Sequence, residues 1–299
     1  MSVCRLVKPI MAGTPLLPVA DVTVFREPLT NEARTEVIEF LAERPLQTVC
    51  IAGFVRDNGL DSPLNRGRFY GCRNSAGRLE GVALIGHATL IEARTDRALR
   101  EFALIAQMST GAHLILGEQE KVERFWDLYA DHGQEMRLLS RELLFELKIA
   151  VENSELVAGL RRATLADMEL ILPVHAELAA AESGINPLET DPEGFRSRCA
   201  RRIEKGRIWI VVESERLIFK ADIQADTPDA VYLEGVYVHP AKRGRGFGRH
   251  CLSQLAQHLL TRTKSICVLV SEENYSAHSF YRLANFKRRE FFLTIFLHR

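Results

Sequence analysis

The segment VYVHPAKRGRGFGRHCL, residues 236–252, joins an apolar run to three alternating glycines. Ahead of it, residues 230–238 (AVYLEGVYV) are rich in Val and Tyr, which predicts a β-strand. Behind it, apolar residues recur every four positions from Phe247 to Leu259, which predicts an amphipathic helix. The glycines therefore form a strand-to-helix turn, and the rest of the sequence is best interpreted outward from that turn.

The chemistry of this turn favours the binding of an anion. The first N–H groups of a helix have no partner within the helix and share the positive end of its dipole. Gly244, Gly246 and Gly248 lack a Cβ atom, so a pyrophosphate can approach the backbone, and Arg243 and Arg245 add positive charge. The alternative is a solvated basic turn. The spacing G-x-G-x-G matches neither G-x-x-x-x-G-K-[ST] nor the dinucleotide pattern G-x-G-x-x-G.

Composition sets broad limits. The chain has 299 residues, 46% of them hydrophobic, which favours two domains with real cores. Lys plus Arg and Asp plus Glu both total 39, so no net field attracts nucleic acid or membrane. The six cysteines are far apart without a C-x-x-C pair, which predicts free thiols in a reducing compartment and no metal. No apolar run and no N-terminal h-region indicates a membrane span or a signal peptide, so we expect a cytoplasmic protein.

The pattern along the chain repeats once. Each half reads as two early helices, an antiparallel meander and two late helices interleaved with strands. The helices are expected at 31–44, 46–59, 96–108, 118–133, 167–182, 191–206, 246–262 and 274–284. The strands are expected within 67–93 and at 112–116, 138–147, 156–164, 208–214, 217–226, 230–238, 266–270 and 291–297.

We therefore expect a lead-in at 1–20, one domain at 21–150 and a second at 151–299, with the boundary near 149–156. A weak echo accompanies this division. FWDLYADHGQEMRLLSRELLFEL (125–147) and FYRLANFKRREFFLTIFL (280–297) both run from an aromatic pair to an Arg-containing strand. The echo favours duplication of the fold, and chance recurrence of aromatic pairs is the alternative.

The turn resembles the acetyl-CoA signature R/Q-x-x-G-x-G/A of the GNAT (GCN5-related) N-acetyltransferases, with Arg243, Gly246 and Gly248 at the defining positions. Downstream, NYSAHSFYRLANF (274–286) is similar to the family's N-x-x-A-x-x-F-Y-x-x-x-G-F. Asn285 replaces the glycine of that pattern, and Asn tolerates positive φ best after Gly. The resemblance covers roughly 157–299. The matching residues of the second motif are Asn274, Ala277, Phe280, Tyr281 and Phe286.

The resemblance implies an α+β fold of two tandem GNAT-like domains, each a mostly antiparallel sheet flanked by helices, as in two-domain bacterial members. Residues 151–299 would be catalytic. Residues 21–150 would be a divergent copy without a cofactor motif, because LILGEQEKVERFW (114–126) has one glycine followed by acidic residues. Its expected work is to cover the acceptor site, to shape specificity or to dimerise.

The activity that the resemblance implies is transfer of an acetyl or larger acyl group from acetyl-CoA to a primary amine, without a metal. The backbone of 236–238 would pair with the pantetheine arm, and Gly235 suits a bulge where the strand splays. Residues 243–248 would hold the pyrophosphate. The expected cofactor-binding residues are Val236, Tyr237, Val238, Arg243, Gly244, Arg245, Gly246, Phe247, Gly248, Asn274 and Tyr281.

Glu234 is the expected general base. Strand alternation places it on one face with Tyr232, Val236 and Val238. An ion pair with Lys220 on the neighbouring strand is the structural alternative, and Glu272 and Glu273 are rival bases.

Tyr281 matches the family's general acid, and its alternative is a core aromatic that shares a stripe with Ala277 and Ala284.

The sequence leaves the roles of several further polar residues undecided between packing and function. Lys220 in FKADI (219–223) fits an internal ion pair better than catalysis. His175 and Glu177 fall on helices that line the acceptor site in this family, although packing against a helix face also accounts for His175. A basic face on helix 191–206 is either solvated or contacts substrate or the other domain. That face consists of Arg198, Arg201, Arg202 and Lys205.

Two rival functions accompany the transferase. A non-catalytic sensor would bind acetyl-CoA without turnover. Nucleic-acid binding through RGRGFGR (243–249) conflicts with the zero net charge. The turn identifies the donor and leaves the acceptor open between a small-molecule amine and a peptide amine, in a monomer or a homodimer.

Overall fold

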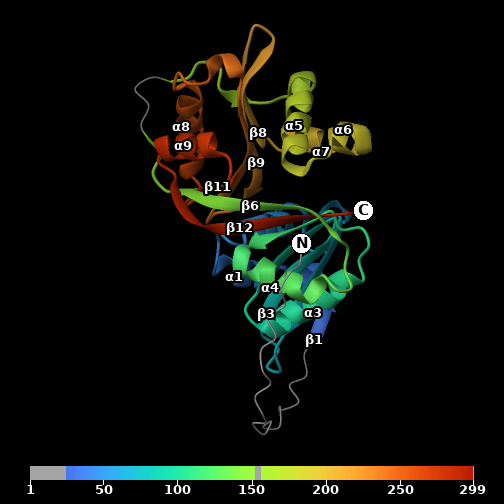
Figure 1. The fold of residues 1–299 in the computed structure, drawn as a ribbon. Coiled ribbons are helices and arrows are strands. Elements are labelled where there is room, and N and C mark those ends of the chain that lie inside the picture. Colours follow the sequence, from blue (N-terminus) through green and yellow to red (C-terminus); the bar gives the residue numbers. More distant parts are fainter. Residues whose placement is uncertain (1–24, 152–155, 299) are drawn as a thin grey trace, which may run out of the picture.

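A single sheet of twelve strands organises the molecule, and helices cover its two faces (Figure 1). The computed structural model describes residues 25–151 and 156–298, so the predicted lead-in at 1–20, together with Cys4, lies outside the described residues. The strand order is β1-β2-β3-β4-β5-β12-β6-β11-β10-β9-β8-β7. Neighbouring strands are antiparallel except at β4–β5 and β10–β11, so the predicted α+β class with a mostly antiparallel sheet is confirmed.

The N-terminal half follows the predicted alternation of elements. Its meander turns at Gly77, which has a φ of +76°, and Thr95 caps the next helix by accepting a hydrogen bond from the Ala98 N–H. The strands are β1 (Phe25–Pro28), β2 (Gly67–Arg73), β3 (Leu79–Gly86), β4 (Ala88–Ala93), β5 (Leu114–Glu118) and β6 (Met136–Leu147). The helices are η1 (Asn31–Ala33), α1 (Arg34–Ala42), α2 (Val49–Asn58), η2 (Pro63–Asn65), α3 (Asp96–Gln107) and α4 (Gln119–Tyr129).

The C-terminal half repeats the order of the main helices and strands, with differences in the short helices and in the first strand. The strand predicted at 156–164 shortens to two residues, because Gly159 adopts a left-handed φ of +77° and interrupts the extended chain. The strands are β7 (Arg161–Arg162), β8 (Ile208–Glu213), β9 (Arg216–Asp226), β10 (Val231–Val238), β11 (Ile266–Ser271) and β12 (Lys287–Leu297). The helices are η3 (Leu165–Asp167), α5 (Met168–Ser183), α6 (Pro187–Thr190), α7 (Pro192–Glu204), η4 (Pro240–Lys242), α8 (Phe247–Leu260) and α9 (Tyr275–Leu283).

The two halves exchange their last strands. β6, the last strand of the N-terminal half, is antiparallel to β11, and β12, the last strand of the chain, is antiparallel to β5. β6 and β12 also pair with each other, from Lys287 opposite Glu146 to Leu297 opposite Met136, and they cross the middle of the molecule side by side (Figure 1). The two segments with the sequence echo, α4–β6 and α9–β12, therefore occupy equivalent places.

The exchange joins the hydrophobic cores. Leu293 and Ile295 of β12 are buried in the core under α3 and α4, whereas Phe145 and Leu147 of β6 are buried in the core under α8. Each such side chain contributes about 1.5–3 kcal/mol of burial free energy. Since each half completes the core of the other, the sheet runs across the division at 150/151, and that division stays a prediction.

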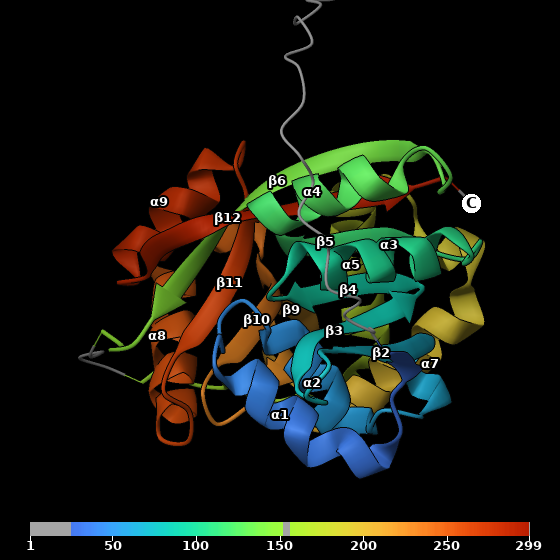
Figure 2. The same cartoon turned by 90° about the horizontal axis from the view of Figure 1, so that it is seen from below.

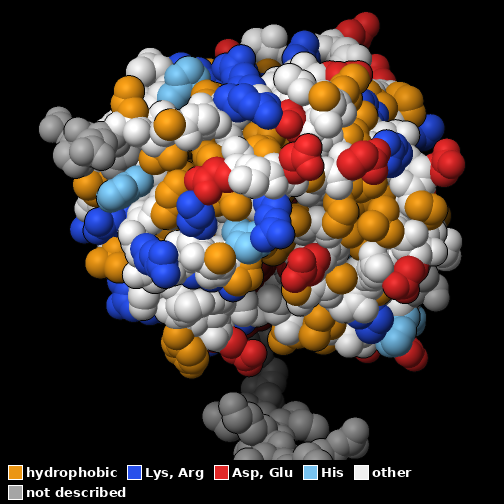
Figure 3. Space-filling view, turned by 90° about the horizontal axis from the view of Figure 1, so that it is seen from above, with side chains coloured by type: hydrophobic (Ala, Val, Ile, Leu, Met, Phe, Trp, Pro, Cys, Tyr) orange, Lys and Arg blue, Asp and Glu red, His pale blue; other side chains and the backbone are white. Residues whose placement is uncertain are grey.

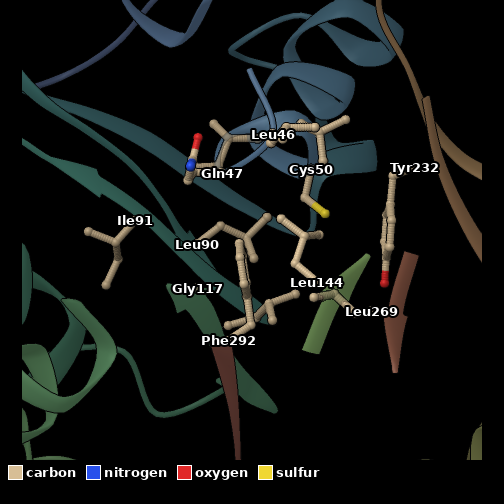
Figure 4. A pocket seen from close by; sticks show the side chains of 13 residues that line it. Leu46, Gln47, Cys50, Leu90, Ile91, Gly117, Leu144, Tyr232, Leu269 and Phe292 are labelled. Carbon is tan, nitrogen blue, oxygen red and sulfur yellow. The ribbon is translucent and has the colours of Figure 1, made fainter. Parts of the chain in front are cut away.

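A helix of the N-terminal half also covers the sheet of the C-terminal half. α2 packs so closely on β9 that a Cβ atom at Gly53 would lie 2.5 Å from the Cβ of Ala225 (Figure 2). Where α2 meets the exchanged strands, a small apolar cavity of about 20 Å³ remains (Figure 4). Its wall includes Cys50, Leu144 and Tyr232, which come from both halves.

Cysteines and surface charge agree with the sequence. The five cysteines within the described residues are free, and four of them are buried. Figure 3 shows a face on which basic and acidic side chains both lie among hydrophobic ones. Within residues 25–151 and 156–298, no helix is both long and apolar enough to span a bilayer.

Candidate active site

A cleft opens where β10 leaves β11. The two parallel strands pair only at Val231 and Tyr232, and β10 continues to Val238 paired with β9 on its other side. The opening is a cavity of about 710 Å³ between β10, the 242–249 loop and α9. Its wall contains most of the residues expected to hold the cofactor, namely Val236, Tyr237, Val238, Arg243, Gly244, Gly246, Gly248, Asn274 and Tyr281. Arg245 and Phe247 are absent from this wall, whereas Lys242, Arg249 and Leu178 belong to it.

A bulge at Gly235 shapes the cleft, as the sequence indicates. Glu234 faces Asp222 of β9 and Tyr237 faces Lys220, so β10 carries one extra residue between these pairs. Gly235 has a φ of +58°, and a Cβ atom there would lie 2.9 Å from Lys220 Nζ, which explains the glycine.

The bulge corrects the predicted strand face. Tyr232 packs in the small core where α2 meets the exchanged strands, whereas Val236 and Val238 pack against the core under α8. Glu234 therefore does not share a face with the two valines, because the extra residue reverses the alternation.

The glycine turn has open space above its backbone. Gly244 and Gly246 have φ values of +74° and +79°, and nothing lies within 3.9 Å of a Cβ atom built on either residue. Gly246 is the N-cap of α8, so the free N–H groups at the start of this helix point to the same space. The turn therefore fits a pyrophosphate, as its sequence predicts.

Gly248 has a different reason to be glycine. A Cβ atom at this position would lie 2.5 Å from Val238 Cγ2, so the residue lets α8 approach β10 closely. Its glycine is therefore required for packing, and the residue also belongs to the wall of the cleft.

The basic residues of the turn are held by other contacts. Arg243 Nε donates to the Val238 carbonyl at 2.8 Å, and Lys242 Nζ lies 2.6 Å from Glu213. Arg249 also lies in the wall of the cleft, although it falls outside the recognised motif. Positive charge in the wall of the cleft therefore comes from Arg243, Lys242 and Arg249 together, and Arg245 is not part of this wall.

α9 forms the opposite wall. Asn274 caps this helix, because its Oδ1 accepts from the Ala277 N–H at 3.0 Å. Tyr281 is buried to 7% exposure, and its ring contacts Phe280 and Phe286. Burial raises the pKa of Tyr281 well above its usual value. Asn285 takes a φ of +68°, so the turn survives the replacement of the family glycine.

Glu234 lies beside the cleft in a buried polar network. Its side chain is 35% exposed, Oε2 is buried without a hydrogen bond, and Arg202 Nη2 lies 3.9 Å away. Lys220, the alternative partner, is instead fully buried against Asp222, with Nζ 2.7 Å from Oδ2. Lys220 Nζ also donates to the carbonyl of Gly235 at 3.2 Å, so this ion pair supports the bulge.

The rival bases and His175 have other partners. Glu272 forms an ion pair with Arg141 at 3.2 Å, and Glu273 is exposed. His175 Nε2 lies 3.7 Å from Asp222 Oδ2, and burial lowers the pKa of His175 to about 3, with the Lys220 charge adding to this effect. The imidazole is therefore neutral at pH 7, and its ring packs on Phe195. Glu177 is exposed.

Two further carboxylates surround Glu234 that the sequence did not indicate. Burial raises the pKa of Glu142 to about 7, although Thr294 Oγ1 donates a 2.6 Å hydrogen bond to it. Enclosure by protein, together with the charges of Glu234 and Glu142, raises the pKa of Glu182 to about 8, although this side chain keeps contact with solvent. Glu142 belongs to β6, so only the strand exchange brings it here, and no local pattern could have revealed it.

The corresponding place in the N-terminal half has no glycine turn. β4 and β5 pair in parallel through residues 88–90 and 114–116, but α4 begins directly after β5. Glu118, at the junction, forms ion pairs with Arg44 and Lys121. In the described residues of this half, no glycine turn follows the parallel strand.

Comparison with known proteins agrees with this geometry. Residues 175–286 match the family model described as the acetyltransferase (GNAT) family. No curated protein matches the chain in sequence. Among solved structures, a GNAT-family acetyltransferase from Colwellia psychrerythraea is similar, with a TM-score of 0.57 and 12% identity, covering 92% of this chain and 100% of that one.

Two more structures share the whole fold. A GCN5-related N-acetyltransferase from Sphaerobacter thermophilus has a TM-score of 0.55 at 12% identity, over 91% of this chain and 94% of that one. A tandem GNAT protein from the clavulanic acid biosynthesis pathway has a TM-score of 0.55 at 13% identity, over 91% and 98%. Residues 175–286 are therefore a domain of the GNAT family, and the chain has the fold of two tandem GNAT-like domains.

Proposed function

We propose that the protein is an acetyl-CoA-dependent N-acetyltransferase that acylates a primary amine with its C-terminal half, residues 151–299. The observation that carries this proposal is the split between β10 and β11. It brings the 236–238 strand, the glycine turn and Tyr281 into one cleft, with Glu234 at the inner end of the same strand.

The residues of the cleft fit acetyl-CoA. The edge of β10 at Val236 to Val238 faces no strand on the cleft side and can pair with a pantetheine amide. Gly244 and Gly246 would hold the pyrophosphate on backbone N–H groups, with Arg243 beside them. When bound, acetyl-CoA supplies a thioester carbonyl activated for acyl transfer. No group of three or more metal-ligating side chains gathers within the described residues.

Glu234 is the proposed base. Its Oε2 has no hydrogen-bond partner among residues 25–151 and 156–298, so it is available to accept a proton from the ammonium form of the acceptor. The Arg202 guanidinium lies 3.9 Å from the same oxygen and forms an ion pair with the carboxylate.

Tyr281 is the proposed acid. Because burial raises its pKa, the phenol holds its proton at neutral pH and can give that proton to a sulfur atom in the cleft. Ring contacts with Phe280 and Phe286 fix the direction of the side chain.

The N-terminal half, residues 21–150, is proposed to close the acceptor side. α2 lies on β9 at Ala225, and β6 brings Glu142 close to Glu234. The acceptor in this proposal is a small-molecule or peptide amine, and free thiols at all five described cysteines fit the cytoplasm.

A panel of primary amines with acetyl-CoA, followed by release of the free CoA thiol, tests this function. Glu234→Gln should lower kcat about 100-fold or more while the Kd for acetyl-CoA stays the same. Glu273→Gln, an exposed glutamate near the cleft, is the matched control and should retain activity. Tight binding of acetyl-CoA without thiol release from any amine would instead establish the non-catalytic sensor.

A further inference from the structure

A second cavity, of about 340 Å³, lies between the two halves. The N-terminal half supplies the end of α2 and the segments at 64–66 and 87–88. The C-terminal half supplies α7, Arg207 and residues 223–225 of β9. This interdomain pocket is separate from the cofactor cleft, since the two share no lining residue.

The wall of the interdomain pocket is strongly basic. Its only carboxylate among the described lining residues is Asp57, which Arg207 and Lys205 contact at 2.8 Å and 3.6 Å. The cations in the wall are Arg66, Arg198, Arg201, Arg202, Lys205 and Arg207. Positive charge therefore exceeds negative charge, although the whole chain is neutral.

Two of these cations have unused hydrogen-bonding capacity. Arg201 is half-buried, and no ion pair or side-chain hydrogen bond holds it within the described part of the chain. Arg207 Nη1 is buried without a hydrogen-bond partner. A buried guanidinium N–H without an acceptor is unfavourable, so an oxyanion in the pocket would stabilise it.

Four basic residues lie on one face of α7 and at its C-terminal end. Arg198, Arg201, Arg202 and Lys205 lie at i, i+3, i+4 and i+7 of α7, so like charges are neighbours on one face. That face lies toward the N-terminal half, where Lys205 contacts Asp57 of α2, and its arginines are partly buried. The basic face predicted on this helix is thus a contact surface between halves with a cavity in it.

Arg202 connects the interdomain pocket to the proposed base. It lies in the pocket wall, while its Nη2 is 3.9 Å from Glu234 Oε2 and its Nη1 is 3.7 Å from Asp222. A molecule whose anionic group lies in the pocket would therefore need only a short chain of atoms to bring its amine to Glu234.

We propose that the acceptor is an amine that also carries an anionic group, a carboxylate or a phosphate, and that the interdomain pocket binds this group. The inference rests on the proposed transferase and names the chemical class of its acceptor. Arg201 and Arg207 bind the anion, Arg202 lies between the anion and Glu234, and the N-terminal half takes part in acceptor selection through its share of the wall.

Binding is tested first with inorganic phosphate on protein saturated with CoA, so that the glycine turn is occupied. Calorimetry should show one phosphate site in the full chain, and Arg201→Ala should weaken it at least tenfold. Arg196→Ala is the matched control on the outer side of α7, where Arg196 pairs with exposed Glu169, and it should bind as the parent does. Arg201→Gln repeats the comparison if the alanine variant does not fold.

Turnover is tested next with matched amines: O-phosphoethanolamine against ethanolamine, and β-alanine against propylamine. The anionic member of a pair should have at least a tenfold higher kcat/KM, and Arg201→Ala should abolish that preference while Arg196→Ala keeps it. The pair that responds distinguishes phosphate from carboxylate.

The outcomes separate the two proposals. Equal kcat/KM for neutral and anionic amines, unchanged in Arg201→Ala, overturns the acceptor class and leaves the transferase intact. Phosphate binding that depends on Arg201, with no thiol release from any amine, overturns the transferase and leaves an anion site.

Discussion

The ring of Phe145 in β6 lies 6.2 Å from the ring of Tyr281 in α9, measured between centroids. Phe145 belongs to the first half of the sequence and Tyr281 to the second, and both are buried in the core under α8. The wall behind the proposed acid is thus built by a strand that the N-terminal half contributes. This contact makes the stability of the candidate site depend on both halves.

Separated halves should not fold independently. Residues 151–299 expressed alone lack β6, which leaves β11 with an open edge and removes Phe145 and Leu147 from the core. We expect an insoluble or unfolded fragment, and co-expression with residues 1–150 should give a soluble complex. Size-exclusion chromatography and circular dichroism check this. A cooperative thermal transition in the isolated fragment would contradict it.

Tyr281→Phe should lower kcat about 100-fold or more and leave the Kd for acetyl-CoA unchanged. The substitution keeps the buried ring and removes only the hydroxyl that is proposed to supply a proton. Tyr275→Phe on the same helix is the control, because Tyr275 is 75% exposed. Stopped-flow turnover and equilibrium binding measure the two quantities, and an unchanged kcat would remove Tyr281 from the mechanism.

Gly248→Ala should destabilise the protein by about 1–3 kcal/mol, because the new Cβ atom overlaps Val238 Cγ2. Val238→Ala makes room for it, so the double variant should lose less stability than the sum of the single variants, with a coupling of about 1 kcal/mol. Urea unfolding measures all three. Additive effects would show that Val238 is not the residue that requires glycine at 248.

Lys220→Met should cost about 3–5 kcal/mol, since it removes the closest cation from the buried Asp222 carboxylate and leaves it with Arg202 Nη1 at 3.7 Å. It also frees the Gly235 carbonyl, so acetyl-CoA binding should weaken. The double variant Lys220→Met with Asp222→Leu removes both charges and should recover most of the stability. If stability recovers in the double variant but acetyl-CoA binding does not, the effect of Lys220 on the bulge is distinct from its effect on folding.

Glu142→Gln should change the pH dependence of stability. In the folded protein the pKa of Glu142 is raised to about 7 from 4.5, so the native state keeps this proton more strongly than the unfolded chain does. Its contribution is fully present below pH 4.5 and is lost as the pH rises through 7.

The parent should therefore lose about 3 kcal/mol more stability than Glu142→Gln between pH 4.5 and pH 8. Urea unfolding at several pH values measures the difference, and Glu273→Gln, at an exposed position, should follow the parent. Parallel curves for parent and Glu142→Gln would show that Glu142 titrates normally.

Local patterns predicted much of the fold and of the candidate site. The four-residue apolar repeat predicted α8, because one face of a helix must be buried. The glycines predicted an open backbone at Gly244 and Gly246, and Asn285 kept its turn, because Asn tolerates a left-handed backbone. The two motifs placed Tyr281 and the glycine turn in one cleft, since each lies at the end of an element next to the split strand.

Only the tertiary structure decided which partners these elements take. The strand exchange that joins β6 to β11 is a non-local choice, because any strand with the right pattern can complete either sheet edge. The same holds for Lys220, which pairs with Asp222 and not with Glu234, and for Glu142, which reaches the site through the exchanged strand.

The sequence alone thus determined the glycine turn of the proposed donor site, because its backbone conformation depends on residues close together in the chain. The proposed acceptor side was decided by tertiary structure. The interdomain pocket places Arg201 and Arg207 opposite the end of α2, although more than a hundred residues separate these segments in the sequence. Electrostatic interactions act through space, so the effect of the charges along one helix depends on which residues fold next to it.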